Sequence, residues 1–368
     1  MKEAGPRDDF YQWQNLSVGL TSACNLRCKM CPVVTREKVS LTREQAFHIA
    51  DFVRRRGFEQ IVIGGGEPTL MPYFWDFLEK LGETDIEIRV LTNATILKPE
   101  HIQRLASNPN LIVNVSIDGV REVHDAIRGE GTFAKSDQAI RALIKAGGRV
   151  AVNTVVQRSN FRTMMDVYER FKDHRLDWHG FAYAEAYYAD LELVPPEHFD
   201  ESIGILTQIY RRNKARKGHV ILSKPMLKNL QLWYRYPEIT THPGVGCTVP
   251  RRLLAIDESG WVFPCWHYQG WKKDTSRNLN ERSLDEIVDD PEVREEILRV
   301  VGPYGCGGCS TTCYFWDNDF RAKTMHPTGR LRVRRAAQHA KAYLVRYHPH
   351  VAHWMGKAKR LGTGGIRS

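Results

Sequence analysis

The chain has 368 residues, of which 42% are hydrophobic and 26% are charged, the composition of a globular protein with enough apolar mass for a substantial core. No run approaches the roughly twenty apolar residues that a membrane span needs, and the charged N-terminus lacks the apolar centre of a signal peptide. We therefore expect a cytoplasmic protein, in which eight cysteines indicate metal or catalytic chemistry rather than disulfides.

Short β-rich runs alternate with helical patterns through the first half of the chain. Strands are expected at Leu16–Leu20, Ile61–Ile63, Ile86–Leu91, Leu111–Ile117, Arg149–Val156 and Trp178–Ala184. Helices are expected at Leu41–Arg56, Pro72–Leu81, Lys98–Ala106, Phe133–Ala146 and Phe161–Phe171. Six βα repeats imply an α/β fold with a parallel sheet, and they are too few to close an eight-stranded barrel. The sequence therefore predicts an open, partial (β/α)6 barrel with its active site at the C-terminal ends of the strands.

The pattern changes after the prolines at 195 and 196. Phe199–Arg216 is helical, and Gly260 marks a hairpin between Leu253–Ile256 and Trp261–Phe263. The predicted domains are an extension (1–14), the partial barrel (15–198), a helical bridge (199–245), a small cysteine-rich domain (246–320) and a basic helical tail (321–368).

The basic charge of the chain is concentrated in its last part. The net charge is +10, but residues 320–368 contain twelve Lys or Arg and no Asp or Glu, so the remainder carries −2. Such a tail either is a solvated helix that maintains solubility or contacts a membrane surface, nucleic acid or another polyanion.

Three cysteines, Cys24, Cys28 and Cys31, lie within eight residues directly after the first predicted strand. A loop of this length can wrap one small metal–sulfur cube, with each thiolate on a different iron and the fourth iron open to a small molecule. The alternative is zinc, but a structural zinc site takes four ligands.

This C-x3-C-x2-C motif resembles the signature of the radical S-adenosylmethionine (SAM) superfamily. The resemblance implies that the three cysteines hold a catalytic [4Fe–4S] cluster and that SAM binds its open iron through amino and carboxylate groups. One-electron reduction would cleave SAM to methionine and a 5′-deoxyadenosyl radical. One departure is Met30, which stands where family members often have an aromatic residue, although a thioether can also pack against adenine.

Further polar motifs follow the predicted strands. The resemblance assigns Gly65-Gly66-Glu67 to the amino group of SAM, with the glycines allowing close backbone approach to a ligand. Ser116 and Asp118 are candidates for the ribose hydroxyls, the alternative for Asp118 being a turn cap.

Arg128 lies in a stretch that resembles the superfamily members with a C-terminal SPASM or twitch module. It either meets the SAM carboxylate or a substrate anion, or caps a helix. Asn93 and Asn153 are expected to face the same site, the alternative being buried, satisfied amides.

Five more cysteines follow, at Cys247, Cys265, Cys306, Cys309 and Cys313. The pattern resembles the SPASM/twitch module and implies one auxiliary [4Fe–4S] cluster, because the full module has seven cysteines and two clusters. The expected ligands are the first four, with Cys313 a spare thiol or a replacement for one of them. A four-cysteine zinc site is the alternative.

The resemblance implies an oxidative enzyme that abstracts hydrogen from its substrate, with a ferredoxin or flavodoxin as electron donor. The first expectation for the substrate is a ribosomally made peptide or protein that is oxidised or cross-linked. Because the chain begins close to the first strand, a separate leader-peptide-binding protein is expected. The alternatives are dehydrogenation of a small alcohol or aminosugar, modification of a lipid or cell-envelope substrate, and a non-catalytic Fe–S or zinc-binding protein.

Overall fold

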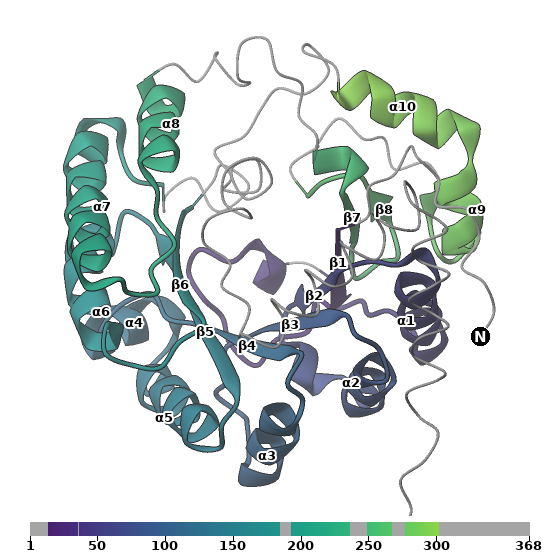
Figure 1. Cartoon of the computed structure of the whole chain (residues 1–368), viewed down its shortest axis with the longest axis horizontal. Coiled ribbons are helices and arrows are strands. Elements are labelled where there is room, and N and C mark those ends of the chain that lie inside the picture. Colours follow the sequence, from purple (N-terminus) through teal and green to yellow (C-terminus); the bar gives the residue numbers. More distant parts are fainter. Residues whose placement is uncertain (1–13, 36, 185–192, 236–248, 267–276, 302–368) are drawn as a thin grey trace, which may run out of the picture. The chain divides into compact units, whose positions relative to one another are not determined.

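One sheet organises the protein. The computed structural model describes residues 14–35, 37–184, 193–235, 249–266 and 277–301 (Figure 1). Its strands are β1 (Asn15–Thr21), β2 (Gln60–Gly65), β3 (Glu87–Thr92), β4 (Leu111–Ser116), β5 (Arg149–Val156), β6 (Trp178–Tyr183), β7 (Leu253–Ile256) and β8 (Val262–Phe263). The strand order is β6-β5-β4-β3-β2-β1-β7-β8, and every neighbouring pair is parallel except β7 with β8. The six predicted strands are confirmed, and so is the open parallel sheet.

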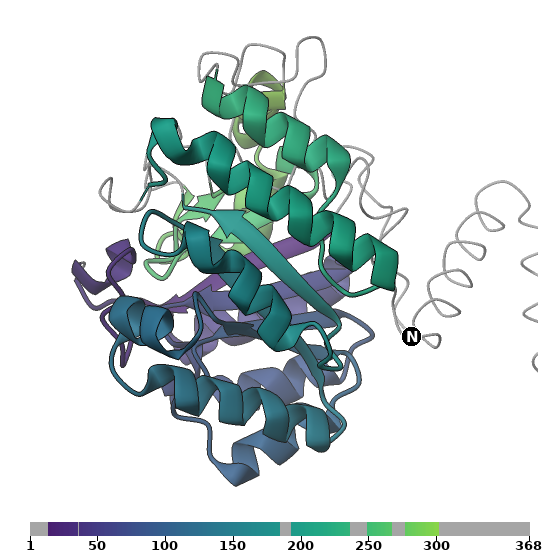
Figure 2. The same cartoon turned by 90° about the vertical axis from the view of Figure 1, so that its left-hand side faces the viewer.

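Helices cover one face of this sheet. They are α1 (Arg43–Arg56), α2 (Phe74–Gly82), α3 (Pro99–Ser107), α4 (Arg121–Arg128), α5 (Thr132–Lys145), α6 (Met164–Phe171), α7 (Pro196–Arg216), α8 (Lys224–Arg235), α9 (Leu284–Asp289) and α10 (Pro291–Val301). Thr42 caps α1 in a capping box and Gly57 ends it with φ 71°, as the sequence indicates. Helices α6, α7 and α8 pack side by side beyond β6 (Figure 2). None of the described helices is long and apolar enough to span a bilayer.

The alternation of side chains assigns the two faces of the sheet. Val18, Ile63 and Val115 are buried in the core that the helices complete. Their neighbours along the strands, such as Gly19 and Asn114, therefore point to the opposite, concave face. The parallel register brings the C-terminal ends of β1 to β6 to one edge, where the predicted site residues lie.

A buried network of charged and polar side chains lies on the concave face at the N-terminal ends of the strands. Gln60 Nε2 donates to Glu87 Oε1 at 2.5 Å, and Arg89 Nε donates to the same oxygen at 3.0 Å. Arg149 pairs with Asp177 at 2.7 Å. Because burying charge is costly unless it is paired, this network is a fixed floor rather than an adaptable surface.

The predicted hairpin forms, and it extends the barrel sheet. Strand β7 pairs in parallel with β1, Ile256 opposite Val18, and turns at Gly260 (φ 82°) into β8. The pairing was not foreseen, because parallel strands joined through a long connection leave no local sequence signal. Helix α8 lies within the predicted helical bridge, although its bounds were not predicted, and helices α4, α9 and α10 were not predicted.

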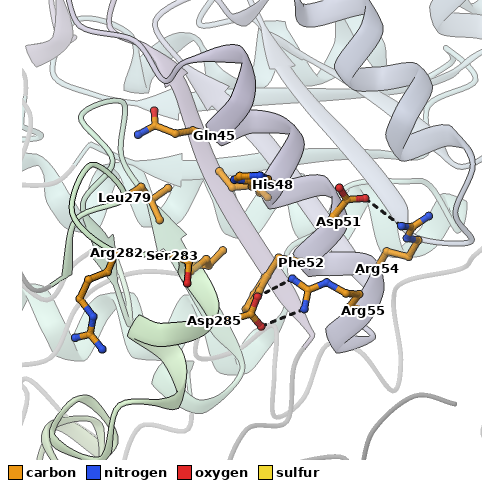
Figure 3. Close-up of a pocket in the computed structure, with 12 residues that line it drawn as sticks. Gln45, His48, Asp51, Phe52, Arg54, Arg55, Leu279, Arg282, Ser283 and Asp285 are labelled. Atoms are coloured by element: carbon orange, nitrogen blue, oxygen red, sulfur yellow. Dashed lines mark hydrogen bonds and ion pairs between the residues drawn. The ribbon is translucent and has the colours of Figure 1, made fainter. Parts of the chain in front are cut away.

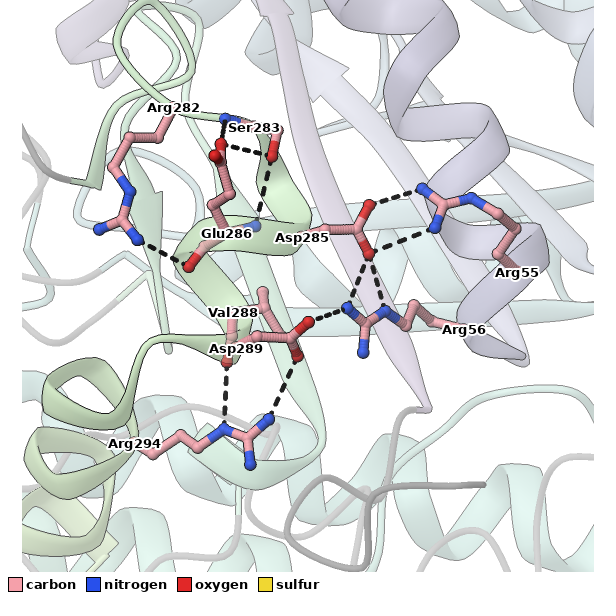
Figure 4. A network of polar contacts seen from close by, with 9 residues as sticks. All are labelled: Arg55, Arg56, Arg282, Ser283, Asp285, Glu286, Val288, Asp289 and Arg294. Atoms are coloured by element: carbon pink, nitrogen blue, oxygen red, sulfur yellow. Dashed lines mark hydrogen bonds and ion pairs between the residues drawn. The ribbon is translucent and has the colours of Figure 1, made fainter. Parts of the chain in front are cut away.

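Helix α9 is attached to α1 by an ionic network (Figure 4). Arg55 and Arg56 donate to Asp285 at 2.6 and 2.7 Å, and Arg56 also donates to Asp289 at 2.5 Å. A pocket of about 480 Å³ lies beside this network, between α1 and residues 279–285 (Figure 3). None of the predicted site residues lines this pocket.

Candidate cluster and cofactor site

The loop after β1 holds the three cysteines at the C-terminal edge of the sheet. Cys28 is buried, whereas Cys24 and Cys31 are half-buried. The loop is fixed against α4, because Lys29 N donates to Ile127 O at 3.0 Å and Cys28 packs against Ile127. The trio therefore lies where the order of strand and motif predicts it.

The surroundings of these sulfur atoms suit metal-bound thiolates. Burial raises the pKa of Cys24, and it raises the pKa of Cys28 to about 11 against an opposing effect of Arg128, so neither thiol ionises readily alone. N–H groups nevertheless face both sulfurs: Leu26 N lies 3.4 Å from Cys24 Sγ, and Arg128 Nη1 lies 3.9 Å from Cys28 Sγ.

The donor set fits an iron–sulfur cluster. Within the described ranges, no three His, Cys, Asp or Glu side chains are arranged to hold one metal ion. Three thiols with N–H donors beside two of them fit an iron–sulfur cube, in which each thiolate meets a different iron.

The Gly-Gly-Glu loop after β2 lies against this cysteine loop. Gly66 N donates to Thr21 O at 2.6 Å, and Glu67 N donates to Ala23 O at 2.8 Å. A Cβ at Gly66 would lie 2.1 Å from Ala23 O, and Gly65 has φ 114°. In the structure these glycines allow the two loops of the protein to approach each other closely, a reason that the sequence did not suggest.

The Glu67 side chain is turned inward and fully buried. Its Oε1 accepts hydrogen bonds from Thr69 Oγ1 at 2.6 Å and Thr92 Oγ1 at 2.8 Å, and its Oε2 accepts from Asn93 N at 2.9 Å. Burial raises the pKa of Glu67, and these hydrogen bonds oppose that rise. The carboxylate thus joins the loop to the end of β3.

Asp118 and Arg128 form a buried ion pair beside Cys28. Arg128 Nε donates to Asp118 Oδ2 at 2.6 Å, and Asp118 Oδ1 accepts from Val155 N at 2.9 Å. Asp118 is fully buried, so its carboxylate links α4, β5 and the β4–α4 loop. Assignment of Asp118 to the ribose and of Arg128 to a carboxylate stays a prediction.

The remaining predicted polar residues also lie at this edge. Asn93 is buried; its Nδ2 donates to Asn25 Oδ1 at 3.0 Å and lies 3.9 Å from Cys24 Sγ. Ser116 and Asn153 are paired neighbours on β4 and β5, both half-buried on the concave face. Their roles toward a ligand stay predictions.

Of the five later cysteines, only Cys265 lies within the described residues, two positions after the end of β8. The next residue, Trp266, donates from Nε1 to Ser17 Oγ on β1 at 2.9 Å, so this segment contacts the barrel. Cys247, Cys306, Cys309 and Cys313 lie outside the described residues, as does the basic tail.

Two polar side chains at this edge were not predicted. Gln157, after β5, is fully buried and has no hydrogen-bond partner for either amide atom among the described residues. Glu258, in the turn of the hairpin, is buried beside Gly19 of β1. The alternation of side chains along β5 could have predicted that Gln157 lies at this edge. The position of Glu258 could not be predicted in this way, because it depends on the pairing of β7 with β1.

The model of the Radical SAM superfamily matches residues 18–171, which span β1 to α6 and include all three cysteines of the first loop. Residues 18–171 are a radical SAM domain. This identification supports an α/β protein of the radical SAM kind, and the family implies SAM and a [4Fe–4S] cluster.

Two kinds of curated relative align with different shares of this chain. The mycofactocin maturase MftC of Mycobacterium ulcerans is 36% identical over 151 residues, 40% of this chain and 41% of the relative. The chain thus spans about two fifths of the length of that maturase. The AdoMet-dependent heme synthase of Methanosarcina barkeri is 24% identical over 329 residues, 82% of this chain and 92% of the relative.

Among solved structures, Streptococcus suis SuiB bound to S-adenosylmethionine superposes with a TM-score of 0.62 at 17% identity, covering 77% of this chain and 67% of SuiB. SuiB has also been solved with its precursor peptide SuiA. At this identity, the likeness shows the radical SAM fold alone.

Proposed function

We propose that this protein is a radical SAM enzyme that removes a hydrogen atom from its substrate to start an oxidation or a cross-link. The observation that carries the proposal is the cysteine trio, placed at the C-terminal edge of a parallel sheet with N–H donors beside two of its sulfurs. A cluster held there would supply the electron that cleaves SAM to methionine and a 5′-deoxyadenosyl radical.

The residues of the chain would then hold the cluster and bind and orient SAM. Cys24, Cys28 and Cys31 would ligate three irons, and Arg128 would hold positive charge beside Cys28 through its pairing with Asp118. The loop of Gly65 and Gly66, with Ser116 and Asn153 on the concave face, would receive SAM. The charged floor and the outer helices would keep water from the reacting groups.

The proposed substrate is a ribosomally made peptide or protein. The maturase relative and the structure of SuiB with its precursor peptide support this choice. A peptide would enter over the concave face, where the half-exposed Leu91 offers an apolar contact. A leader-peptide-binding protein and an acidic ferredoxin or flavodoxin are the proposed partners, and the cytoplasm is the proposed location.

A small molecule is the second candidate substrate. The specific observation in its favour is the heme synthase relative, which aligns over 82% of this chain, about twice the share aligned with the maturase. Under either proposal Cys247, Cys265, Cys306 and Cys309 hold one auxiliary cluster, with Cys313 a spare thiol or a replacement for one of them. This cluster takes an electron from the substrate radical or orients the substrate.

The direct test is an anaerobic reconstitution followed by a dithionite-driven assay for 5′-deoxyadenosine. We expect about eight irons per chain for two cubes and release of 5′-deoxyadenosine that Cys28→Ala abolishes. Cys265→Ala is the matched control: it should lower the iron content while 5′-deoxyadenosine is still formed. Zinc in place of iron, or equal release by Cys28→Ala, would contradict the proposal.

The substrate class is tested by adding candidate precursor peptides or small molecules to the same assay. An oxidised or cross-linked peptide should lose two hydrogens for each 5′-deoxyadenosine released, one as the abstracted atom and one as a proton whose electron passes to the auxiliary cluster, and mass spectrometry measures this loss. A small molecule that alone is consumed in this ratio would favour the second candidate.

A further inference from the structure

A groove of about 480 Å³ lies on the outside of the barrel, between helices α3 and α5, which pack side by side (Figure 1). Leu97, Ile102 and Ala142 are among the apolar residues that line it, and Lys135 and Lys145 line it on the side of α5. Among the described residues, no carboxylate lines this groove. It is therefore an apolar surface with positive charge at its margin.

The positive charge of the groove is free to attract a partner. Lys135 and Lys145 are exposed, and neither forms an ion pair with another described residue. The single carboxylate of α5, Asp137, is buried and pairs with Arg141 and Arg170. Because residues 1–319 together carry a net charge of −2, this basic face is a local feature and not the average of the barrel.

One end of the groove is joined to the cysteine loop by hydrogen bonds. Thr95, which lines this end, donates from Oγ1 to Asn93 Oδ1 at 2.6 Å and accepts from Asn25 Nδ2 at 2.9 Å. Asn93 Nδ2 lies 3.9 Å from Cys24 Sγ. Two side chains, Thr95 and Asn93, thus separate the groove from a cluster ligand. Since electron transfer weakens steeply with distance, an electron donor bound here would lie close to its acceptor.

The charge of the groove selects among the molecules that could occupy it. Residues 320–368 of this chain contain twelve Lys or Arg and no Asp or Glu, so the two lysines would repel them. A small acidic protein would be attracted instead. Complexes of electron-transfer proteins bury little area, and their interfaces combine an apolar centre with a polar rim, as this groove does.

We propose that the groove between α3 and α5 docks a small acidic electron-transfer protein of the ferredoxin or flavodoxin class, with Lys135 and Lys145 facing its carboxylates. This inference rests on the proposed function, because the docked protein delivers the electron that starts the reaction. In this step the reduced donor loses one electron and the [4Fe–4S] cluster gains it, while no bond forms or breaks.

The first test measures the binding of two oxidised acidic probes, a plant-type [2Fe–2S] ferredoxin and a flavodoxin, to the cluster-loaded protein by isothermal titration calorimetry. In Lys135→Glu/Lys145→Glu, the Kd for the bound probe should rise about tenfold at low salt, and the difference should shrink in about 0.5 M salt. The matched control is Lys214→Glu/Lys228→Glu, the same change of charge at exposed positions of α7 and α8, which should change the Kd by less than about twofold.

A second measurement separates docking from the reaction that follows it. With the reduced probe held below its Kd, release of 5′-deoxyadenosine by Lys135→Glu/Lys145→Glu should fall about tenfold, in proportion to the lost binding. Dithionite is a small reductant that needs no docking surface, so dithionite-driven release should equal that of the wild type.

Four results would overturn the inference. Neither probe binds the wild type, or Lys135→Glu/Lys145→Glu binds the probe as tightly as the wild type does. The two double variants weaken binding equally, which would assign the effect to net charge. Dithionite-driven release falls together with probe-driven release, which would assign the lysines a structural role. Absence of dithionite-driven release from the wild type would instead refute the proposed function.

Discussion

At the scale of single residues, the site depends on glycines and on a few buried charges. The two loops that carry the cysteines and the Gly-Gly-Glu motif touch through backbone atoms, so even one methyl group has no room at Gly66. The Gly-Gly-Glu motif is visible in the sequence, but the structural need for glycine at Gly66 is not, because it arises from the close approach of another loop.

Gly66→Ala should destabilise the protein by about 1–3 kcal/mol, the usual cost of overpacking, and should lower the iron retained after reconstitution. The matched control is Gly204→Ala, an exposed position in α7 with nothing near an added Cβ, which should stabilise by about 1 kcal/mol. Chemical denaturation measures both, and equal effects would contradict this account.

Asp118→Asn should cost about 3–5 kcal/mol, because it leaves the Arg128 guanidinium buried without its anionic partner. The exposed pair of Arg162 and Glu201 provides the control, since Glu201→Gln should leave the free energy of unfolding unchanged. A stable Asp118→Asn variant would mean that the pair is not needed to hold α4 beside the cysteine loop.

At the scale of elements, β6 carries a buried titratable group beneath the helices. His179 is fully buried, its Nε2 lies 3.0 Å from Thr154 Oγ1, and burial lowers its pKa from 6.5 to about 3. The folded protein therefore keeps this ring neutral at pH values where the unfolded chain binds a proton.

Stability should fall as the pH falls below 6.5, because between pH 6.5 and about 3 the unfolded state binds one more proton at His179 than the folded state. From pH 7.5 to 5.5 this histidine alone should cost about 1.4 kcal/mol. In His179→Gln, the loss of unfolding free energy over that interval should be smaller by this amount. An unchanged pH dependence would show that His179 binds protons equally in the folded and unfolded states.

The attachment of α9 to α1 is also an element-scale feature. Burial opposes the ionised form of Asp285, but hydrogen bonds from Arg55 and Arg56 outweigh it and lower the pKa of this carboxyl (Figure 4). Asp285→Ala should therefore destabilise by about 1 kcal/mol, and less in 1 M salt. Asp76→Ala, which breaks the exposed pair with Arg43, should have no measurable effect, and a similar loss for both variants would refute the role of the network.

At the scale of the whole molecule, the local sequence pattern predicts most strands and helices of the barrel, but it does not predict that β7 pairs with β1. The alternation of apolar residues in the strands and the helix cap at Thr42 were sufficient to predict the βα units, since these units depend on residues close together in sequence. The pairing of β1 with β7, and with it the place of Glu258, depends on residues more than 200 positions apart. The cysteine trio could be predicted because three ligands share one loop, whereas the hydrogen bonds of Glu67 come from β3 and its own turn.

The central claim is that Cys24, Cys28 and Cys31 bind a [4Fe–4S] cluster with one iron open to SAM. The most direct measurement is electron paramagnetic resonance of the reduced, anaerobically reconstituted protein in a Cys265→Ala background, recorded with and without SAM. The account predicts a cluster signal that shifts when SAM is added and disappears in the additional Cys28→Ala variant. A cluster signal that does not change when SAM is added, or that persists in the Cys28→Ala variant, would contradict this account.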